Sequence, residues 1–156
     1  MTPPLPLTGT CRCGGVTLRA TAAPLITSAC HCRGCQRMTA SAYSLSALFP
    51  SDGFEATGET VIGGMHGPEQ RHHHCARCLG WLFTRLPALD HVVNVRATMF
   101  DDTSWFAPFL ETATDERLAW ATVPAPRSFP SLPRAAEFGD LIAEYAAWDP
   151  SSIEET

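Results

Sequence analysis

Cys11-Arg12-Cys13 and Cys75-Ala76-Arg77-Cys78 are the two stretches that decide the fold of this chain. Each stretch places two thiols within four residues, and more than sixty residues separate the two pairs. A closed structural zinc site takes four ligands, and the two pairs supply four thiolates. Shared by one ion, they would close a long loop and tie together strand ends that are distant in the sequence.

The remaining three of the seven cysteines fall in Cys30-His31-Cys32-Arg33-Gly34-Cys35. Three sulfurs this close can surround one ion without a ligand from elsewhere in the chain. A zinc ion with three protein ligands keeps a fourth position for water or a substrate thiol, and it lowers the pKa of that thiol. An alternative partition joins Cys32 and Cys35 to Cys75 and Cys78. It leaves the other three cysteines, Cys11, Cys13 and Cys30, without a regular pattern, so the spacing favours four plus three.

Polar residues beside the cysteines are further candidates. Arg33 and Arg37 can offset the thiolate charge or bind a carboxylate of an incoming ligand, and ordinary surface charge is the alternative. His31 and the run His72-His73-His74 are candidates for a fourth ligand or a general acid. The histidine run itself is predicted to be an exposed polar strand that leads into Cys75. Cys75-Ala76-Arg77-Cys78 also fits a redox motif, which the other cysteines make the weaker interpretation.

Composition excludes several classes of protein. The 156 residues predict one domain over 1–156, with a core over about 7–133. The net charge is −5, all eleven basic residues are arginine and they form no run, so nucleic-acid binding and lysine Schiff-base chemistry lack support. No apolar run is long enough to span a membrane, and the N-terminus does not resemble a secretory signal. A reducing, cytoplasmic location is therefore expected; the oligomeric state is not fixed.

Hydrophobic patterning predicts a mainly β fold with short helical turns. A short helical turn is expected at 34–39, and an amphipathic helix at about 135–148, after a proline-rich connector at 123–133. The expected strands are 16–20, 25–30, 42–49, 54–56, 60–63, 71–74, 81–85 and 91–96.

Three motifs in register resemble the glutathione-dependent formaldehyde-activating enzyme (GFA, or centromere protein V-like) family. Gly9-Thr10-Cys11-Arg12-Cys13-Gly14-Gly15-Val16 resembles its GxCxCGxV opening, and residues 30–37 resemble its CHCxxCxR motif. Cys75–Cys78, followed by Leu82-Phe83, resembles CxxCGxxLF, and Asp101-Asp102 with Phe106 and Pro108 is similar to DDPxxFxP. Trp120 is similar to the family's terminal tryptophan. The likeness extends over roughly Leu7 to Pro133.

The resemblance implies an Mss4-like, zinc-bound fold of stacked β-sheets, of the kind also seen in B-type methionine-sulfoxide reductases. It implies a structural zinc at Cys11, Cys13, Cys75 and Cys78, and a second, catalytic zinc at Cys30, Cys32 and Cys35. The implied activity is that of a carbon–sulfur lyase that joins a small-molecule thiol, glutathione, to an aldehyde, formaldehyde, giving S-hydroxymethylglutathione.

The chain also departs from the family pattern. Leu79 stands where the family usually has the glycine after CxxC, and Thr103 stands at the first proline of DDPxxFxP. Glu111-Thr112-Ala113 replaces a histidine and an apolar pair that many members carry. These differences concern the substrate rather than the cysteines. A non-enzymatic zinc module that binds a protein partner is the alternative function, and methionine-sulfoxide reduction is a third.

Overall fold

The computed structural model of the chain describes residues 3–64 and 69–152. It is mainly β, as the sequence predicts, with two α-helices, α1 (Arg33–Thr39) and α2 (Phe138–Ala147). Short 3₁₀ turns lie at Ser51–Gly53, Pro87–Leu89, Ala97–Met99, Thr114–Glu116, Ala135–Glu137 and Pro150–Ser152. None of the helices in these two ranges is long and apolar enough to cross a bilayer.

The strands are β1 (Leu7–Thr10), β2 (Thr17–Ala20), β3 (Ile26–Cys30), β4 (Ser44–Pro50), β5 (Phe54–Thr57), β6 (Thr60–Gly63), β7 (Arg71–Cys75), β8 (Trp81–Arg85), β9 (Val92–Arg96), β10 (Leu110–Thr112) and β11 (Arg127–Ser128). Their contacts divide the chain into two compact units. Among the described residues, the first comprises 25–45 and 106–152, and the second comprises 3–24, 46–64 and 69–105. The sequence prediction of one domain over 1–156 stays a prediction.

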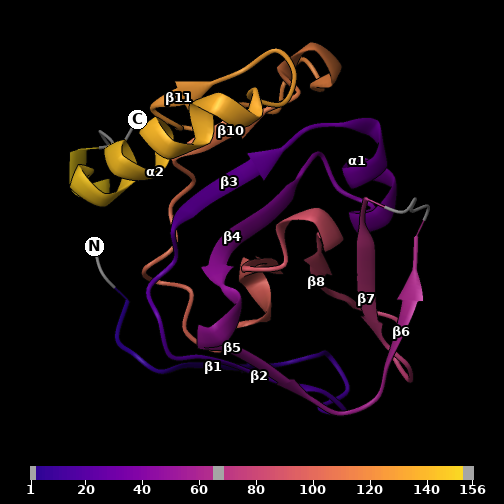
Figure 1. Cartoon of the computed structure of the whole chain (residues 1–156). Helices are drawn as coiled ribbons and strands as arrows, with labels where there is room; N and C mark the ends of the chain where they lie inside the picture. The colour runs from indigo at the N-terminus through magenta and orange to yellow at the C-terminus, as the bar shows by residue number, and fades with distance from the viewer. Residues whose placement is uncertain (1–2, 65–68, 153–156) are drawn as a thin grey trace. The chain divides into compact units, whose positions relative to one another are not determined.

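The first unit pairs β3 with β10, and β10 with β11, all in parallel. Helix α2 lies against β3, and Figure 1 shows it beside β10 and β11 as well. The aromatic side chain of Phe109 is buried and contacts the rings of Tyr145 and Trp148, at centroid distances of 5.6 and 5.3 Å. This packing explains the apolar stripe of the helix, because removal of apolar surface from water stabilises the fold, and full burial of one such side chain contributes about 1.5–3 kcal/mol.

The second unit contains an antiparallel sheet of β1, β2 and β5, and an antiparallel series in the order β4, β9, β8, β7, β6. Phe49 is fully buried, and its ring contacts Phe100 and Trp105 at 5.6 and 6.5 Å. In the hairpin of β7 and β8, the register shifts between His73 and His74. Cys11, the first cysteine of one pair, directly follows β1, and Cys75, the first of the other pair, ends β7.

Most of the strand predictions are confirmed. Strands β6 and β8 have the predicted bounds, and the C-terminal helix and the turn at 34–39 are also present. Strand β10 was not predicted, because all three of its residues are buried and the short segment has no alternation to detect. Strand β11 lies inside the stretch that was interpreted as a connector.

Candidate metal sites

Two tight turns in the second unit carry four cysteines, Cys11, Cys13, Cys75 and Cys78, which we call the four-cysteine cluster. The turns share one backbone pattern. The N–H of Cys11 donates to the carbonyl of Val16 at 3.0 Å, and the N–H of Cys75 donates to that of Gly80 at 3.1 Å. Each hydrogen bond closes a loop of six residues that contains both cysteines of its pair.

The sulfurs of the four-cysteine cluster fit one zinc ion. All four lie within 4.8 Å of one another. The Sγ of Cys13 lies 3.5 Å from that of Cys11 and 3.7 Å from that of Cys75. A tetrahedron with Zn–S bonds of about 2.3 Å has sulfur–sulfur edges of about 3.8 Å. The chemistry of this donor set, four thiolates with no other ligand, is that of a structural zinc site.

Hydrogen bonds distribute the protons of the metal-free four-cysteine cluster unevenly. Burial opposes ionisation of Cys11, but the Val16 N–H, at 3.3 Å from its sulfur, and the neighbouring thiols outweigh burial and lower its pKa to about 6. For Cys13, the N–H of Gly15 is the largest single influence and favours the thiolate, yet donation to Cys11, burial and the other two thiols together outweigh it and raise the pKa to about 11. The turns therefore stabilise thiolate in part before any metal binds.

The three-cysteine cluster, Cys30, Cys32 and Cys35, lies in the first unit, where β3 ends and α1 begins. Cys30 ends β3, and Cys32 is the N-cap of α1, its sulfur accepting the Cys35 N–H at 3.3 Å. The three sulfurs lie within 4.8 Å of one another, and all three residues are half-buried. The tight spacing of the motif brings the sulfurs together because the chain turns into a helix within it.

The same three sulfurs are electrostatically distinct. A hydrogen bond from Cys35 is the main cause that lowers the pKa of Cys30 to about 5, against the opposing effect of burial. The pKa of Cys35 is raised well above its usual range by that same bond and then by burial, and burial raises the pKa of Cys32. The hydrogen bond between Cys30 and Cys35 therefore favours the thiolate on Cys30, and a bound divalent cation would displace the remaining protons.

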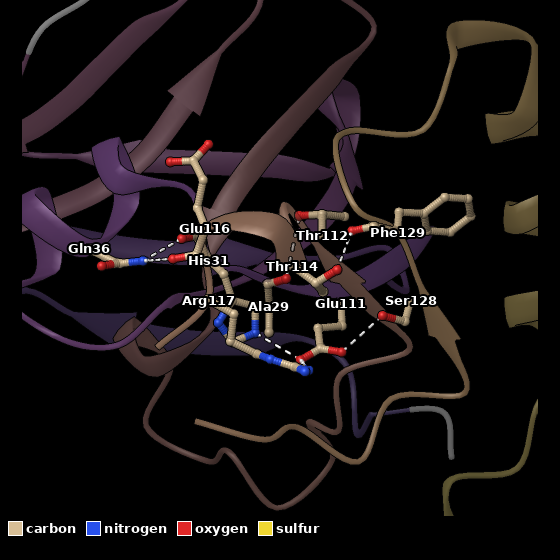
Figure 2. Close-up of polar contacts among 10 residues, drawn as sticks. All are labelled: Ala29, His31, Gln36, Glu111, Thr112, Thr114, Glu116, Arg117, Ser128 and Phe129. Atoms are coloured by element: carbon tan, nitrogen blue, oxygen red, sulfur yellow. Dashed lines mark hydrogen bonds and ion pairs between the residues drawn. The ribbon is translucent and has the colours of Figure 1, made fainter. Parts of the chain in front are cut away.

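A polar network links His31, which lies between Cys30 and Cys32, to Glu111 of β10 and to Gln36 of α1 (Figure 2). The Nε2 of His31 lies 3.0 Å from Oε1 of Glu111, which also accepts from Arg117 at 3.0 Å. The side-chain amide of Gln36 donates to the carbonyls of His31 and Glu116, at 2.6 and 2.9 Å. No sequence pattern indicated a role for Glu111, Gln36 or Arg117, because a short strand with a central glutamate gives no signal of burial.

A family model described as glutathione-dependent formaldehyde-activating enzyme (GFA) matches residues 6–116. This match spans all seven cysteines and more than half of the chain. The chain belongs to the GFA family. No curated protein matches the sequence of this GFA-family protein.

One solved structure of similar fold is the crystal structure of a protein from Rhodobacter sphaeroides. It is 16% identical in sequence, its alignment covers 60% of this chain and 87% of that chain, and the TM-score is 0.50. At this identity, the likeness concerns the fold alone.

The two predicted ligand-binding arginines lie on or beside the three-cysteine cluster of the GFA-family protein. Arg33 is exposed, its N–H donates to the carboxylate of Glu116 at 2.6 Å, and its guanidinium donates to Gln36 at 3.1 Å. Arg37 is exposed in the last turn of α1. Their contact with a thiol ligand stays a prediction.

The histidine run is not the exposed strand that was predicted. His72 is buried, and its ring packs edge-on against Trp81. The Nδ1 of His72 lies 2.9 Å from the hydroxyl oxygen of Thr84. His73 stacks on Phe83 at 4.5 Å, and burial lowers its pKa. The prediction of exposure was wrong because histidine was treated as a polar surface residue, whereas the rings of His72 and His73 pack against Trp81 and Phe83.

Proposed function

We propose that this protein is a zinc-dependent enzyme of carbon–sulfur lyase type, which joins a glutathione-like thiol to a formaldehyde-like aldehyde or releases the two. One observation carries the proposal: the three-cysteine cluster offers three ligands and not four. Within residues 3–64 and 69–152, no further cysteine, histidine or carboxylate completes that group. Three ligands and an open position are typical of catalytic zinc, whereas four thiolates are typical of structural zinc.

A zinc ion at Cys30, Cys32 and Cys35 would supply a Lewis acid that lowers the pKa of an incoming thiol at the open position. The chain's own contribution is to hold the three thiolates on half-buried residues, where solvent and a small ligand can reach them. The N–H of Cys35 donates to the sulfur of Cys32 at 3.3 Å, and the hydroxyl of Thr112 helps to lower the pKa of Cys30. Such hydrogen bonds reduce the charge that three thiolates place on one ion.

The reaction is a balanced addition. The sulfur of the thiolate forms a bond to the aldehyde carbon, and the electron pair of the C=O bond moves to oxygen. The oxygen then takes up the proton that the thiol released, so no oxidant, reductant or net proton is needed. Exposed Arg33 and Arg37, beside the cluster, supply positive charge suited to the carboxylates of a glutathione-like thiol.

The identity of a general acid is not part of the proposal. His31 is fully buried, with Nε2 beside Glu111. His72 and His73 engage Thr84 and Phe83 in the second unit. These contacts support structural roles for the histidines that the sequence analysis considered as acids.

Exchange NMR of a mixture of glutathione and formaldehyde tests the proposal. Zinc-loaded protein is expected to accelerate exchange between free and hydroxymethylated glutathione, and Cys32→Ser is expected to abolish the acceleration. Cys13→Ser is not a suitable control, because it removes a ligand of the four-cysteine cluster; Arg19→Gln, an exposed change in β2, is suitable. If wild-type protein gives the rate of buffer alone, this substrate pair is excluded.

Metal analysis separates the enzyme from the alternative, a non-enzymatic zinc module. Two zinc ions per chain, one of which takes up an added thiol, support the enzyme. A single zinc ion, or two ions that are both inert to added thiol, would favour the module.

A further inference from the structure

Glu111 is a carboxylate at the centre of β10, and only 4% of the residue is exposed. Taking a carboxylate out of water costs several kcal/mol, and an apolar side chain of similar volume often serves stability equally well. Burial of this charge therefore requires a local explanation. Its surroundings provide one, because the side chain lies against the segment that carries the three-cysteine cluster.

Both oxygens of Glu111 are engaged (Figure 2). Oε1 lies 3.0 Å from Nε2 of His31 and accepts a hydrogen bond of the same length from Arg117. Oε2 accepts from the hydroxyl of Ser128 at 3.0 Å. Arg117 balances the charge, while His31 is the partner that belongs to the cysteine motif. The structure records no hydrogen bond at either ring nitrogen of His31, so the contact with Glu111 is a close approach of the imidazole to the carboxylate.

His31 is held from three further directions. The backbone N–H of His31 donates to the carbonyl of Thr112 at 2.9 Å, and its backbone carbonyl accepts from the side-chain amide of Gln36 at 2.6 Å. The edge of its ring packs against Tyr43, at a centroid distance of 5.2 Å. Because Glu111 also lies beside Nε2, contacts restrain both the backbone and the ring of His31.

We infer that Glu111 is a positioning residue for the three-cysteine cluster and acts through His31. His31 separates Cys30 from Cys32, and alternate residues of an extended segment point to one side. Fixing His31 therefore fixes the directions from which two of the three sulfurs approach a metal. The register agrees, since β10 pairs with β3 and places Thr112 opposite Cys30. The inference rests on the zinc assignment within the proposed function, and not on the lyase reaction.

Zinc affinity, measured site by site by competition with a chelator, tests this role in the full-length protein. Glu111→Ala is expected to weaken zinc binding at the three-cysteine cluster about 10-fold or more, the usual cost of losing an outer-shell partner. Glu111→Gln keeps an oxygen acceptor and is expected to lose less. Binding at the four-cysteine cluster should not change. Glu144→Ala is the matched control, because this exposed carboxylate in the same unit pairs with Arg127 at 2.7 Å, away from the cysteine motif.

A cobalt spectrum provides a readout that a purely structural role would not move. The spectrum of cobalt-loaded Cys32→Ser, subtracted from that of wild-type protein, isolates the three-cysteine cluster. Glu111→Ala should shift the visible bands of that difference spectrum, whereas Glu144→Ala should leave them in place. Unchanged bands, unchanged affinity, or an equal loss at both clusters would overturn the inference.

Two further outcomes are also decisive. If wild-type protein binds a single zinc ion, the zinc assignment of the proposed function fails, and the inference fails with it. If wild-type protein binds two zinc ions and Glu111→Ala binds both with the same affinities, the inference alone fails. Should Glu111→Ala not fold, Ser128→Ala replaces it, because this exposed residue donates to Oε2. Zinc affinity at the three-cysteine cluster alone is then expected to fall about threefold, which corresponds to the loss of one hydrogen bond. An unchanged zinc affinity would overturn the role of Glu111.

Discussion

Leu79 adopts a backbone conformation that its side chain disfavours. Its φ is +57°, and 65% of the residue is exposed, so packing does not compensate for the strain. The left-handed region costs a residue with a Cβ about 1–2 kcal/mol. The turn around Cys75 imposes this conformation, because the N–H of Leu79 donates to the carbonyl of Cys75 at 2.9 Å. The six-residue loop of the metal site therefore overrides the local preference of the sequence.

Leu79→Gly is expected to raise the free energy of unfolding by roughly 0.5–1 kcal/mol. Relief of the left-handed strain exceeds the extra entropy that glycine loses on folding. Urea unfolding of the zinc-loaded protein measures the change. Leu79→Ala is the control, since it removes the exposed side chain and keeps the Cβ. An equal gain in Leu79→Ala would show that the backbone conformation is not the cause.

At the scale of an element, one residue, Cys32, is both the N-cap of α1 and a proposed ligand of the three-cysteine cluster. The sulfur of Cys32 accepts the N–H of Cys35 and caps the helix. Serine is a good N-cap because its hydroxyl accepts the same N–H, whereas alanine cannot. The helix cap and the metal ligand can therefore be separated by choosing the substitution.

Cys32→Ser is expected to lose the second zinc ion and keep α1. Cys32→Ala loses the same zinc ion and the cap as well, so it should be less stable than Cys32→Ser by about 1 kcal/mol. Zinc analysis and urea unfolding of the two variants provide the comparison. Equal stability of the two variants would contradict a capping role, and retention of two zinc ions in Cys32→Ser would contradict its role as a ligand.

Prediction from sequence succeeded where an element has its own local pattern. Strand β8 was predicted at its observed bounds because Gly80 precedes a run of apolar and aromatic residues. Strand β10 was missed, since Leu110, Glu111 and Thr112 are all buried and the pattern lacks alternation. The network around Glu111 was missed for a different reason: its partners lie up to 80 residues away in the sequence, and only the folded chain brings them together.

Across the whole molecule, each compact unit contains one of the two cysteine clusters. The spacing of the seven cysteines was enough to predict this grouping, because Cys30, Cys32 and Cys35 need no distant partner. The four-cysteine cluster joins turns from residues 11–13 and 75–78, so a zinc ion there would close a loop of more than sixty residues. The two clusters should therefore contribute very differently to stability.

Cys78→Ser is expected to destabilise the second unit, by on the order of 4 kcal/mol or more, because it removes a ligand from a closed site. Hydrogen exchange should show lost protection in β1, β2, β7 and β8. Cys32→Ser should leave these strands protected. If Cys32→Ser reduces their protection as much as Cys78→Ser does, the division into a structural and an open site is wrong.

Cadmium NMR of the cadmium-substituted protein, with and without glutathione, tests the central claim most directly. The shift of each cadmium resonance reports the number of thiolates bound to that ion. The account predicts two resonances, one from each cluster. Added glutathione should shift only the resonance that is absent from Cys32→Ser. That resonance should shift toward the position of the resonance from the four-thiolate ion. Two resonances that both ignore glutathione, or a single resonance in wild-type protein, would contradict an open, thiol-binding site at Cys30, Cys32 and Cys35.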